Sequence, residues 1–199
     1  MHNGREGGII LLSGLSGVGK STLIHDALDD NPRQLHYLKD FTTRERRPTD
    51  NDTEYVFVSD NEFDRQKTLA ADWQEGSIYE NRYGHDTAKY KRLMQLGNYL
   101  IGCCYPSLED SESLNVYYNL NKITVIHVDL PDEIRAERLI SQRGEEGKRR
   151  LEKDASWIMS EGYKKRIDIR FNANGPKLKN RHEFNAIIQQ IISATSDKS

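Results

Sequence analysis

The chain reads Gly14-Leu15-Ser16-Gly17-Val18-Gly19-Lys20-Ser21-Thr22 near its start, a run that fills every fixed position of the pattern G-x-x-x-x-G-K-[ST]. Residues 8–12 before it are typical of a buried strand, and residues 21–28 after it indicate the start of a helix. A glycine-rich turn in this context can curl backbone N–H groups around phosphate oxygens, and the helix N-terminus adds partial positive charge. The run therefore predicts a binding site for the phosphates of a nucleoside triphosphate.

Each residue type in this loop has its own expected task. The Lys20 ammonium is expected to neutralise the β- and γ-phosphates during catalysis, and the Ser21 hydroxyl to bind Mg²⁺. The nucleotide-binding set is Gly14, Ser16, Gly17, Val18, Gly19, Lys20, Ser21 and Thr22.

The composition favours one globular domain over residues 1–199, with 36% apolar and 30% charged residues. No apolar run approaches the roughly 20 residues needed to span a bilayer, and no secretion signal is expected. We therefore expect a cytoplasmic protein without a membrane partner. The net charge of −2 gives no overall basic footprint for nucleic acid. The adjacent Cys103 and Cys104 favour neither a structural disulfide nor a zinc site.

The order of patterns along the chain predicts an α/β fold. Strands are expected near 8–12, 35–39, 55–58, 99–104, 123–128 and 169–172, and helices over 21–28, 59–70, 87–97, 131–142, 149–166 and 181–193. Parallel strands with helical crossovers make a three-layer domain around a central sheet. The stretch 40–86 interrupts this alternation with short strands and a turn at Gly76-Ser77. We interpret it as an inserted acceptor-binding module.

An arginine cluster follows the expected strand at 35–39. Arg44 and Arg47 lie three residues apart in a loop and can form a multidentate clamp for a phosphate. The hydroxyl of Tyr55, on the neighbouring strand, can add a hydrogen-bond donor. The chain therefore contains a second candidate phosphate site.

Together with the glycine loop, this clamp resembles the guanylate kinase family, whose fold is that of P-loop nucleoside triphosphatases. Arg44, Arg47 and Tyr55 fall on that family's Thr-Thr-Arg run, second arginine and tyrosine, with one residue fewer in the loop. Tyr83-Gly84 falls on its Tyr-Gly pair. The resemblance implies that Arg44, Arg47, Tyr55 and Tyr83 bind the phosphate of the acceptor, with ATP and Mg²⁺ as donor and cofactor.

The resemblance continues in a basic segment near the C-terminus. Residues 138–145 look like the family's Arg-Leu-x-x-Arg-Gly segment, and Arg150-Leu151 like the pair that reopens the next helix. It implies that Arg138, Arg143 and Arg150 are catalytic and reach the transferred phosphoryl group. Residues 143–150 would then be an arginine lid.

The positions that would read the nucleobase depart from the family. Asp40 stands where the family has a serine, and Asp72 stands in for a glutamate one methylene longer. His85 replaces a second serine. The strand that ends Asp-x-Asp in the family ends Gly102-Cys103-Cys104 here, and thiols cannot replace carboxylate acceptors. What replaces this acidic pair is open, since no spacing argument supports Glu109 or Asp110.

These departures leave several functions open. We expect an ATP-dependent phosphotransferase whose acceptor is a small phosphorylated molecule, either GMP, read through Asp40 and Asp72, or another nucleoside monophosphate. Ribose 1,5-bisphosphate phosphokinases, which are sugar-phosphate kinases, have a similar fold and also lack the acidic pair. Two further functions stay open, namely a non-catalytic guanylate kinase-like binding module and a small ATPase or GTPase switch. The sequence makes no prediction of oligomeric state.

Overall fold

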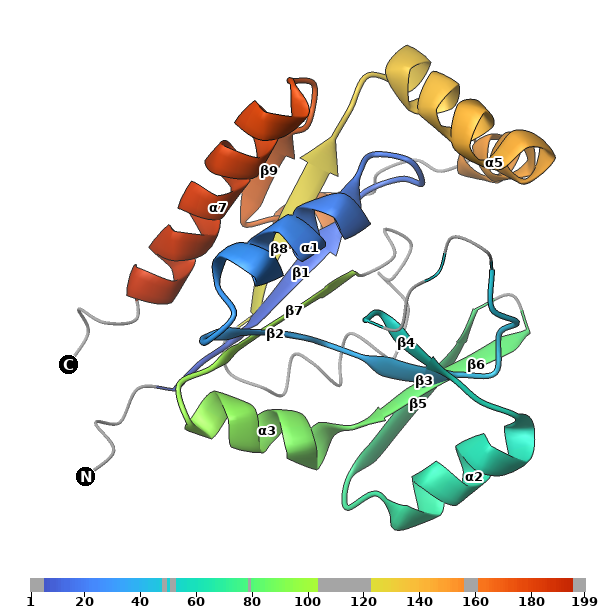
Figure 1. The fold of residues 1–199 in the computed structure, drawn as a ribbon, viewed down its shortest axis with the longest axis vertical. Helices are drawn as coiled ribbons and strands as arrows, with labels where there is room; N and C mark the ends of the chain where they lie inside the picture. Colours follow the sequence, from blue (N-terminus) through green and yellow to red (C-terminus); the bar gives the residue numbers. More distant parts are fainter. Residues whose placement is uncertain are drawn as a thin grey trace.

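Five parallel strands form the central sheet of the computed structural model (Figure 1). They are β1 (Ile9–Ser13), β2 (Leu35–Tyr37), β7 (Tyr99–Cys103), β8 (Ile123–Asp129) and β9 (Ile169–Asn172). Their order across the sheet is β2-β7-β1-β8-β9, so β1 lies in the centre. The structure describes residues 6–47, 50, 53–78, 80–103, 123–155 and 161–194, and the positions Cys104, Glu109 and Asp110 lie outside these ranges.

Helices cover both faces of the central sheet. The helices α1 (Lys20–Asp30) and α7 (Lys177–Ala194) lie on one face, and α3 (Thr87–Gln95) lies on the other. Alternate residues of β1 pack against the helices on opposite faces of the sheet, because successive side chains of a strand point to opposite faces. Ile10 and Leu12 pack with α1 and α7, whereas Ile9 and Leu11 pack with residues of α3. The prediction of a three-layer α/β fold with a parallel sheet is confirmed.

Residues 40–86 form a second sheet. Its strands are β3 (Asp40–Thr42), β4 (Tyr55–Phe57), β5 (Trp73–Ile78) and β6 (Asn81–Asp86), in the order β4-β3-β6-β5, and α2 (Asp60–Leu69) belongs to the same segment. The turn predicted at Gly76-Ser77 is wrong. Both residues pair with β6, and the pairing continues to Ile78 opposite Asn81, so the chain reverses later.

Residues at the ends of α2 and α3 have the types that favour helix ends. The Ser59 hydroxyl accepts a hydrogen bond from the Glu62 N–H at the start of α2. The Asp86 carboxylate accepts one from the Ala88 N–H at the start of α3. Gly97 follows α3 with a φ of 83°, the left-handed conformation that glycine adopts at low cost.

The basic segment near the C-terminus is helical. The helix α5 (Asp132–Ala155) contains one non-helical residue, Gly144, with φ 52° and ψ −125°. Gly144 divides α5 into a first arm, residues 132–143, and a second arm, residues 145–155. The sequence predicted helices over 131–142 and 149–166 with a loop between them. That loop is wrong, because the residues between the two predicted helices are helical except at Gly144. The short helix α6 (Glu161–Lys165) follows, and α7 begins at Lys177, earlier than the expected residue 181.

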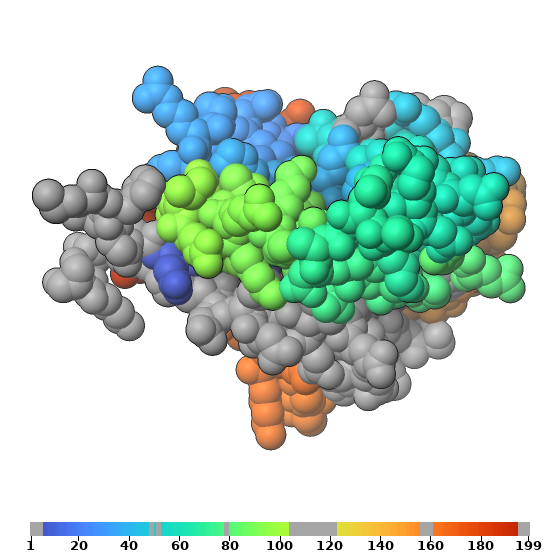
Figure 2. All heavy atoms as spheres, turned by 90° about the horizontal axis from the view of Figure 1, so that it is seen from below, coloured from blue at the N-terminus to red at the C-terminus, as the bar shows by residue number. Residues whose placement is uncertain are grey.

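The helix α3 connects the two sheets. Seen from below, α3 in light green lies beside the teal segment that contains α2 (Figure 2), and α3 contacts β5 of the second sheet. The Tyr90 hydroxyl of α3 donates to the Lys39 carbonyl between β2 and β3, at 2.5 Å. Neither α3 nor any other helix in the described ranges is long and apolar enough to cross a membrane.

The second sheet depends on one buried phenylalanine for its stability. The Phe63 side chain on α2 is 0% exposed, meets the Trp73 ring edge-on at 5.2 Å and lies 4.2 Å from the Arg82 guanidinium. We expect Phe63→Ala to lower the free energy of unfolding by about 3–5 kcal/mol. Leu69→Ala on the same helix is the control, because Leu69 is 67% exposed, and should change it by less than about 0.5 kcal/mol. Denaturant unfolding measures both, and equal losses would contradict this role.

Candidate functional site

The predicted phosphate loop, residues 14–19, lies between the carboxyl end of β1 and the start of α1. Gly19 is the N-cap residue of α1 with a φ of 102°, a conformation that favours glycine. In the described structure no side chain caps α1, and its first turn carries no acidic residue. The positive end of the helix dipole is therefore available to an anion.

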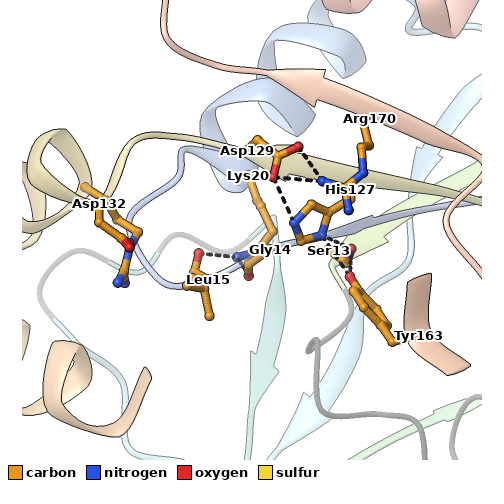
Figure 3. Close-up of polar contacts among 10 residues, drawn as sticks. Ser13, Gly14, Leu15, Lys20, His127, Asp129, Asp132, Tyr163 and Arg170 are labelled. Atoms are coloured by element: carbon orange, nitrogen blue, oxygen red, sulfur yellow. Dashed lines mark hydrogen bonds and ion pairs between the residues drawn. The ribbon is translucent and has the colours of Figure 1, made fainter. Parts of the chain in front are cut away.

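Lys20 folds back over this loop (Figure 3). Its ammonium donates hydrogen bonds to the carbonyl of Gly14 at 2.6 Å and to that of Leu15 at 3.0 Å. Both acceptors are neutral backbone groups. An anion in the loop would offer the ammonium a stronger, charge-assisted partner.

A buried polar network lies directly behind the loop (Figure 3). The Nδ1 atom of His127 on β8 lies 3.2 Å from the Ser13 hydroxyl and 3.0 Å from the Tyr163 hydroxyl, and these two hydroxyls also contact each other. Its Nε2 atom lies 3.2 Å from Asp129, which also pairs with Arg170. Burial lowers the pKa of His127 and outweighs the nearby Asp129 carboxylate. Ser13, which directly precedes the loop, therefore contacts both β8 and α6 through its side chain.

A cleft of about 770 Å³ lies between the loop, the second sheet and α5. This volume is typical of small-molecule sites. The cleft brings together residues predicted from three separate parts of the sequence. Its lining includes Ser16, Gly17, Val18, Gly19, Lys20, Ser21 and Thr22 from the loop and α1, Arg44, Arg47, Tyr55 and Tyr83 from the acceptor module, and Arg138, Arg143 and Arg150 from α5. Gly14 lies outside the lining, with its carbonyl bound by Lys20.

The two clamp arginines are held by carboxylates. The Arg44 Nη1 atom lies 2.9 Å from Asp50, and although burial opposes it, this hydrogen bond raises the pKa of Arg44. The Arg47 Nε atom lies 3.3 Å from Oε1 of Glu146 on the second arm of α5. Arg150 donates to the same oxygen of Glu146 at 2.9 Å. Glu146 therefore joins the expected clamp to the expected lid.

Tyr55 and Tyr83 stand next to the clamp. Their rings meet edge-on, with centroids 5.9 Å apart, and the Arg44 guanidinium lies 5.4 Å from the Tyr55 centroid. Burial raises the pKa of Tyr55, so its hydroxyl stays protonated. It can therefore donate a hydrogen bond to a phosphate at neutral pH.

Positive charge is crowded in the cleft. Burial and the charge of Arg150 lower the pKa of Arg143, whose Nη1 atom is buried and has no hydrogen-bond partner among the described residues. Burial together with the charges of Arg150 and Arg44 lowers the pKa of Arg47. A lowered arginine pKa signals that the surroundings disfavour its charge. An anion with several charges would relieve this repulsion.

The two carboxylates proposed for base recognition lie outside the cleft lining. The Oδ1 atom of Asp40 lies 2.7 Å from Nδ1 of His85, and the Asp40 side chain is 25% exposed. Asp40 is still close to the site, since it lies opposite Tyr55 in the β3–β4 pair. Asp72 forms an ion pair with Lys91 on α3 at 2.6 Å. Its side chain is therefore already engaged away from the cleft.

The end of β7 is tight for any side chain at residue 102. A Cβ atom on Gly102 would lie 3.0 Å from the Cβ of Leu38, which is 6% exposed. Cys103 lines the cleft and is exposed, and desolvation by the surrounding protein raises the pKa of its thiol to about 11. The charge of Glu54, which also lines the cleft, contributes to that rise. Glu54 is therefore a carboxylate close to the end of β7.

Sequence reasoning missed the acidic residues of the cleft. Asp50, Glu54 and Glu146 line it alongside the arginines that it identified. The crowding of arginines was the available signal, because buried cations need carboxylate partners. The sequence did not indicate which carboxylates these would be. Among the described residues no three His, Cys, Asp or Glu side chains form a group that could hold a metal ion.

Comparison with known proteins fits this geometry. A family model for guanylate kinase matches residues 6–174. The chain belongs to the guanylate kinase family.

Individual relatives in the guanylate kinase family cover most of the chain. The guanylate kinase of Latilactobacillus sakei subsp. sakei (strain 23K) is 29% identical over 164 residues, which are 79% of each chain. That of Malacoplasma penetrans (strain HF-2) is 30% identical over 189 residues, 92% of this chain and 85% of its own. The crystal structure of guanylate kinase from Anaplasma phagocytophilum has a TM-score of 0.59 at 17% identity and covers 98% of this chain and 89% of its own. This structure shares the fold.

The neutral His127 makes stability depend on pH. Its pKa is lowered in the fold from the ordinary 6.5, so the unfolded chain binds the extra proton first and stability falls as the pH drops below 6.5. We expect His127→Gln to flatten the pH dependence of the unfolding free energy just below that value, because all other titrating groups are common to both proteins. Thermal or denaturant unfolding from pH 8 to about pH 5 measures the difference. Parallel curves would contradict the effect of burial on His127.

Proposed function

We propose that this chain is an ATP-dependent kinase that transfers the γ-phosphoryl group of ATP to the phosphate of a nucleoside monophosphate, with GMP as the first candidate. One observation carries the proposal: the phosphate loop, the arginine clamp and the lid arginines line a single cleft, where Glu146 contacts both Arg47 and Arg150. Family membership and relatives named guanylate kinase support GMP as the acceptor.

ATP would place its phosphates on residues 14–22. Lys20 would leave the carbonyls of Gly14 and Leu15 and bind the β- and γ-phosphates. The residues present fit Mg²⁺, because the exposed Ser21 hydroxyl lines the cleft at the start of α1 and offers the oxygen ligand that this ion prefers. Bound Mg²⁺ would supply charge neutralisation on the phosphates.

The acceptor phosphate would bind between Arg44, Arg47, Tyr55 and Tyr83. One of its oxygens would attack the γ-phosphorus, a new P–O bond would form, and the bond between that phosphorus and the bridging oxygen of ADP would break. No general base is needed, because the attacking oxygen is already an anion at neutral pH. The clamp therefore contributes alignment and charge stabilisation.

The arginines of α5 would complete the site. Arg138, Arg143 and Arg150 lie on the cleft side of α5 and would approach the transferred group when residues 143–150 close. Closure would exclude water, which would otherwise accept the phosphoryl group in place of the substrate. The acceptor's negative charge favours closure, since it attracts arginines from both sides of the cleft.

The Asp40–His85 pair would meet the nucleobase. A carboxylate accepts hydrogen bonds only, and guanine presents two neighbouring N–H donors on its Watson–Crick edge, whereas adenine presents a donor beside an acceptor. His85 contacts Asp40 through Nδ1 and Oδ1, and the carboxylate keeps lone pairs on both oxygens that can accept from a ligand. This arrangement favours GMP over AMP.

A coupled assay of ADP release across a panel of acceptors tests the proposed reaction. We expect turnover with GMP, weaker turnover with AMP, and a smaller preference for GMP in Asp40→Asn. Lys20→Ala should lower kcat by about 10²–10³-fold while the protein stays folded. Turnover with ribose 1,5-bisphosphate alone would replace the nucleotide kinase by a sugar-phosphate kinase. ATP binding without any acceptor-dependent turnover would favour a binding module or a hydrolase.

The variant Arg44→Ala tests whether Arg44 binds the acceptor phosphate and not ATP. Loss of a charge-assisted hydrogen bond to the acceptor phosphate should raise the acceptor KM by about 10–100-fold and leave the KM for ATP within about threefold. Arg65→Ala is the matched control, because Arg65 is exposed on α2 and its ion pair in the described structure is with Glu62 of the same helix. Equal rises in both KM values would contradict the assignment of Arg44 to the acceptor.

A further inference from the structure

A buried ion pair joins the two arms of α5. The Nη1 atom of Arg135 on the first arm lies 2.9 Å from Oδ2 of Asp154 on the second arm, and the two side chains are 7% and 2% exposed. Arg135 also binds the exposed Asp132 through Nε at 3.0 Å. None of these residues has a part in the phosphoryl transfer described above.

The same pair binds the backbone of the phosphate loop at one residue. The Ser16 N–H donates to Oδ2 of Asp154 at 3.1 Å, and the Ser16 carbonyl accepts from Nη1 of Arg135 at 3.4 Å. The backbone N–H and the backbone carbonyl of Ser16 therefore both have hydrogen-bond partners on α5.

Apolar packing reinforces the contact. Leu139 on the first arm is 1% exposed and packs directly on the loop, where a Cβ atom on Gly17 would lie 2.6 Å from its Cγ. Gly147 lets the second arm approach equally closely, since a Cβ there would lie 2.3 Å from the Leu139 carbonyl oxygen. The loop and both arms of α5 thus form one packed unit.

A buried ion pair is by itself weak evidence of a gain in stability. Removing two charges from water is costly, and well-packed apolar residues of similar size are often at least as stabilising. What apolar residues could not supply at this place are the two hydrogen bonds to Ser16. The distinctive contribution of the pair is therefore geometric.

We propose that Arg135 and Asp154 are positioning residues for the donor nucleotide, which hold the phosphate loop in register with the helix that carries Arg138, Arg143 and Arg150. The inference rests on the proposed kinase function for its consequence. Displacing a reacting group by about 1 Å can cost about 10²-fold in rate. A second consequence is electrostatic: without Arg135, the Asp154 carboxylate would face the ATP phosphates uncompensated.

The decisive variant is Arg135→Met/Asp154→Leu, which removes both charges and keeps the volume. We expect its unfolding midpoint to stay near that of wild type, its ATP dissociation constant to rise about tenfold or more, and kcat to fall. The KM for the acceptor should stay within about threefold, because the clamp does not contact the pair. The control is Lys179→Met/Glu183→Leu, an exposed pair on α7, which should leave all four values unchanged.

Calorimetry without acceptor measures the ATP affinity of each variant and tests the positioning role. A folded double variant with wild-type ATP affinity and kcat would overturn the positioning role. If the double variant unfolds, Asp154→Asn and Asp154→Ala replace it: Asn retains an acceptor for Ser16 and should keep the ATP affinity within about threefold, whereas Ala should lose about tenfold. Equal affinities in these two would also overturn the proposal. Wild-type protein that binds ATP but transfers no phosphoryl group would overturn the kinase function alone.

Discussion

Repulsion between like charges is the constraint on which the arrangement of the cleft depends. Lys20, Arg44, Arg47, Arg143 and Arg150 all line one cavity of about 770 Å³. The fold keeps them there with a small number of acceptors: backbone carbonyls for Lys20, Asp50 for Arg44, and a single carboxylate shared by Arg47 and Arg150. Burial first, and the neighbouring arginine charges after it, lower the pKa of Arg47 and of Arg143, so their surroundings still disfavour the charged forms. The polyphosphate of a nucleotide is the kind of ligand that would balance this charge.

The positive charges of the cleft come from three parts of the fold: the phosphate loop, the clamp and the helix α5. Different contacts hold each part in place. The phosphate loop follows the central strand β1 and is held from behind by the network of Ser13, His127 and Tyr163. The clamp belongs to a small sheet with its own packing around Phe63. The lid arginines belong to a helix broken at Gly144. A loop held from behind by buried contacts and flanked by two smaller units would suit the proposed transfer, in which two anions must be brought into line.

Packing around Gly102 at the end of β7 is tight. A Cβ atom on Gly102 would lie 3.0 Å from the Cβ of Leu38, so a side chain there would require Leu38 to shift by a few tenths of an ångström. Asp40 and His85 instead place a paired carboxylate next to Tyr55, on the second sheet.

Features that depend on neighbours in the chain could be predicted from the residues alone. The glycine loop, the spacing of Arg44 and Arg47 and the caps at Ser59 and Asp86 are short-range, because backbone geometry sets them within a few residues. The turn between β5 and β6 was misplaced, since strand pairing decides where a hairpin ends. Tertiary packing alone decided that Glu146 joins clamp and lid, and that Asp154 reaches Ser16 across 138 positions of the chain. Such contacts depend on the break at Gly144, which folds two helical arms together, and no local pattern specifies which side chains then meet.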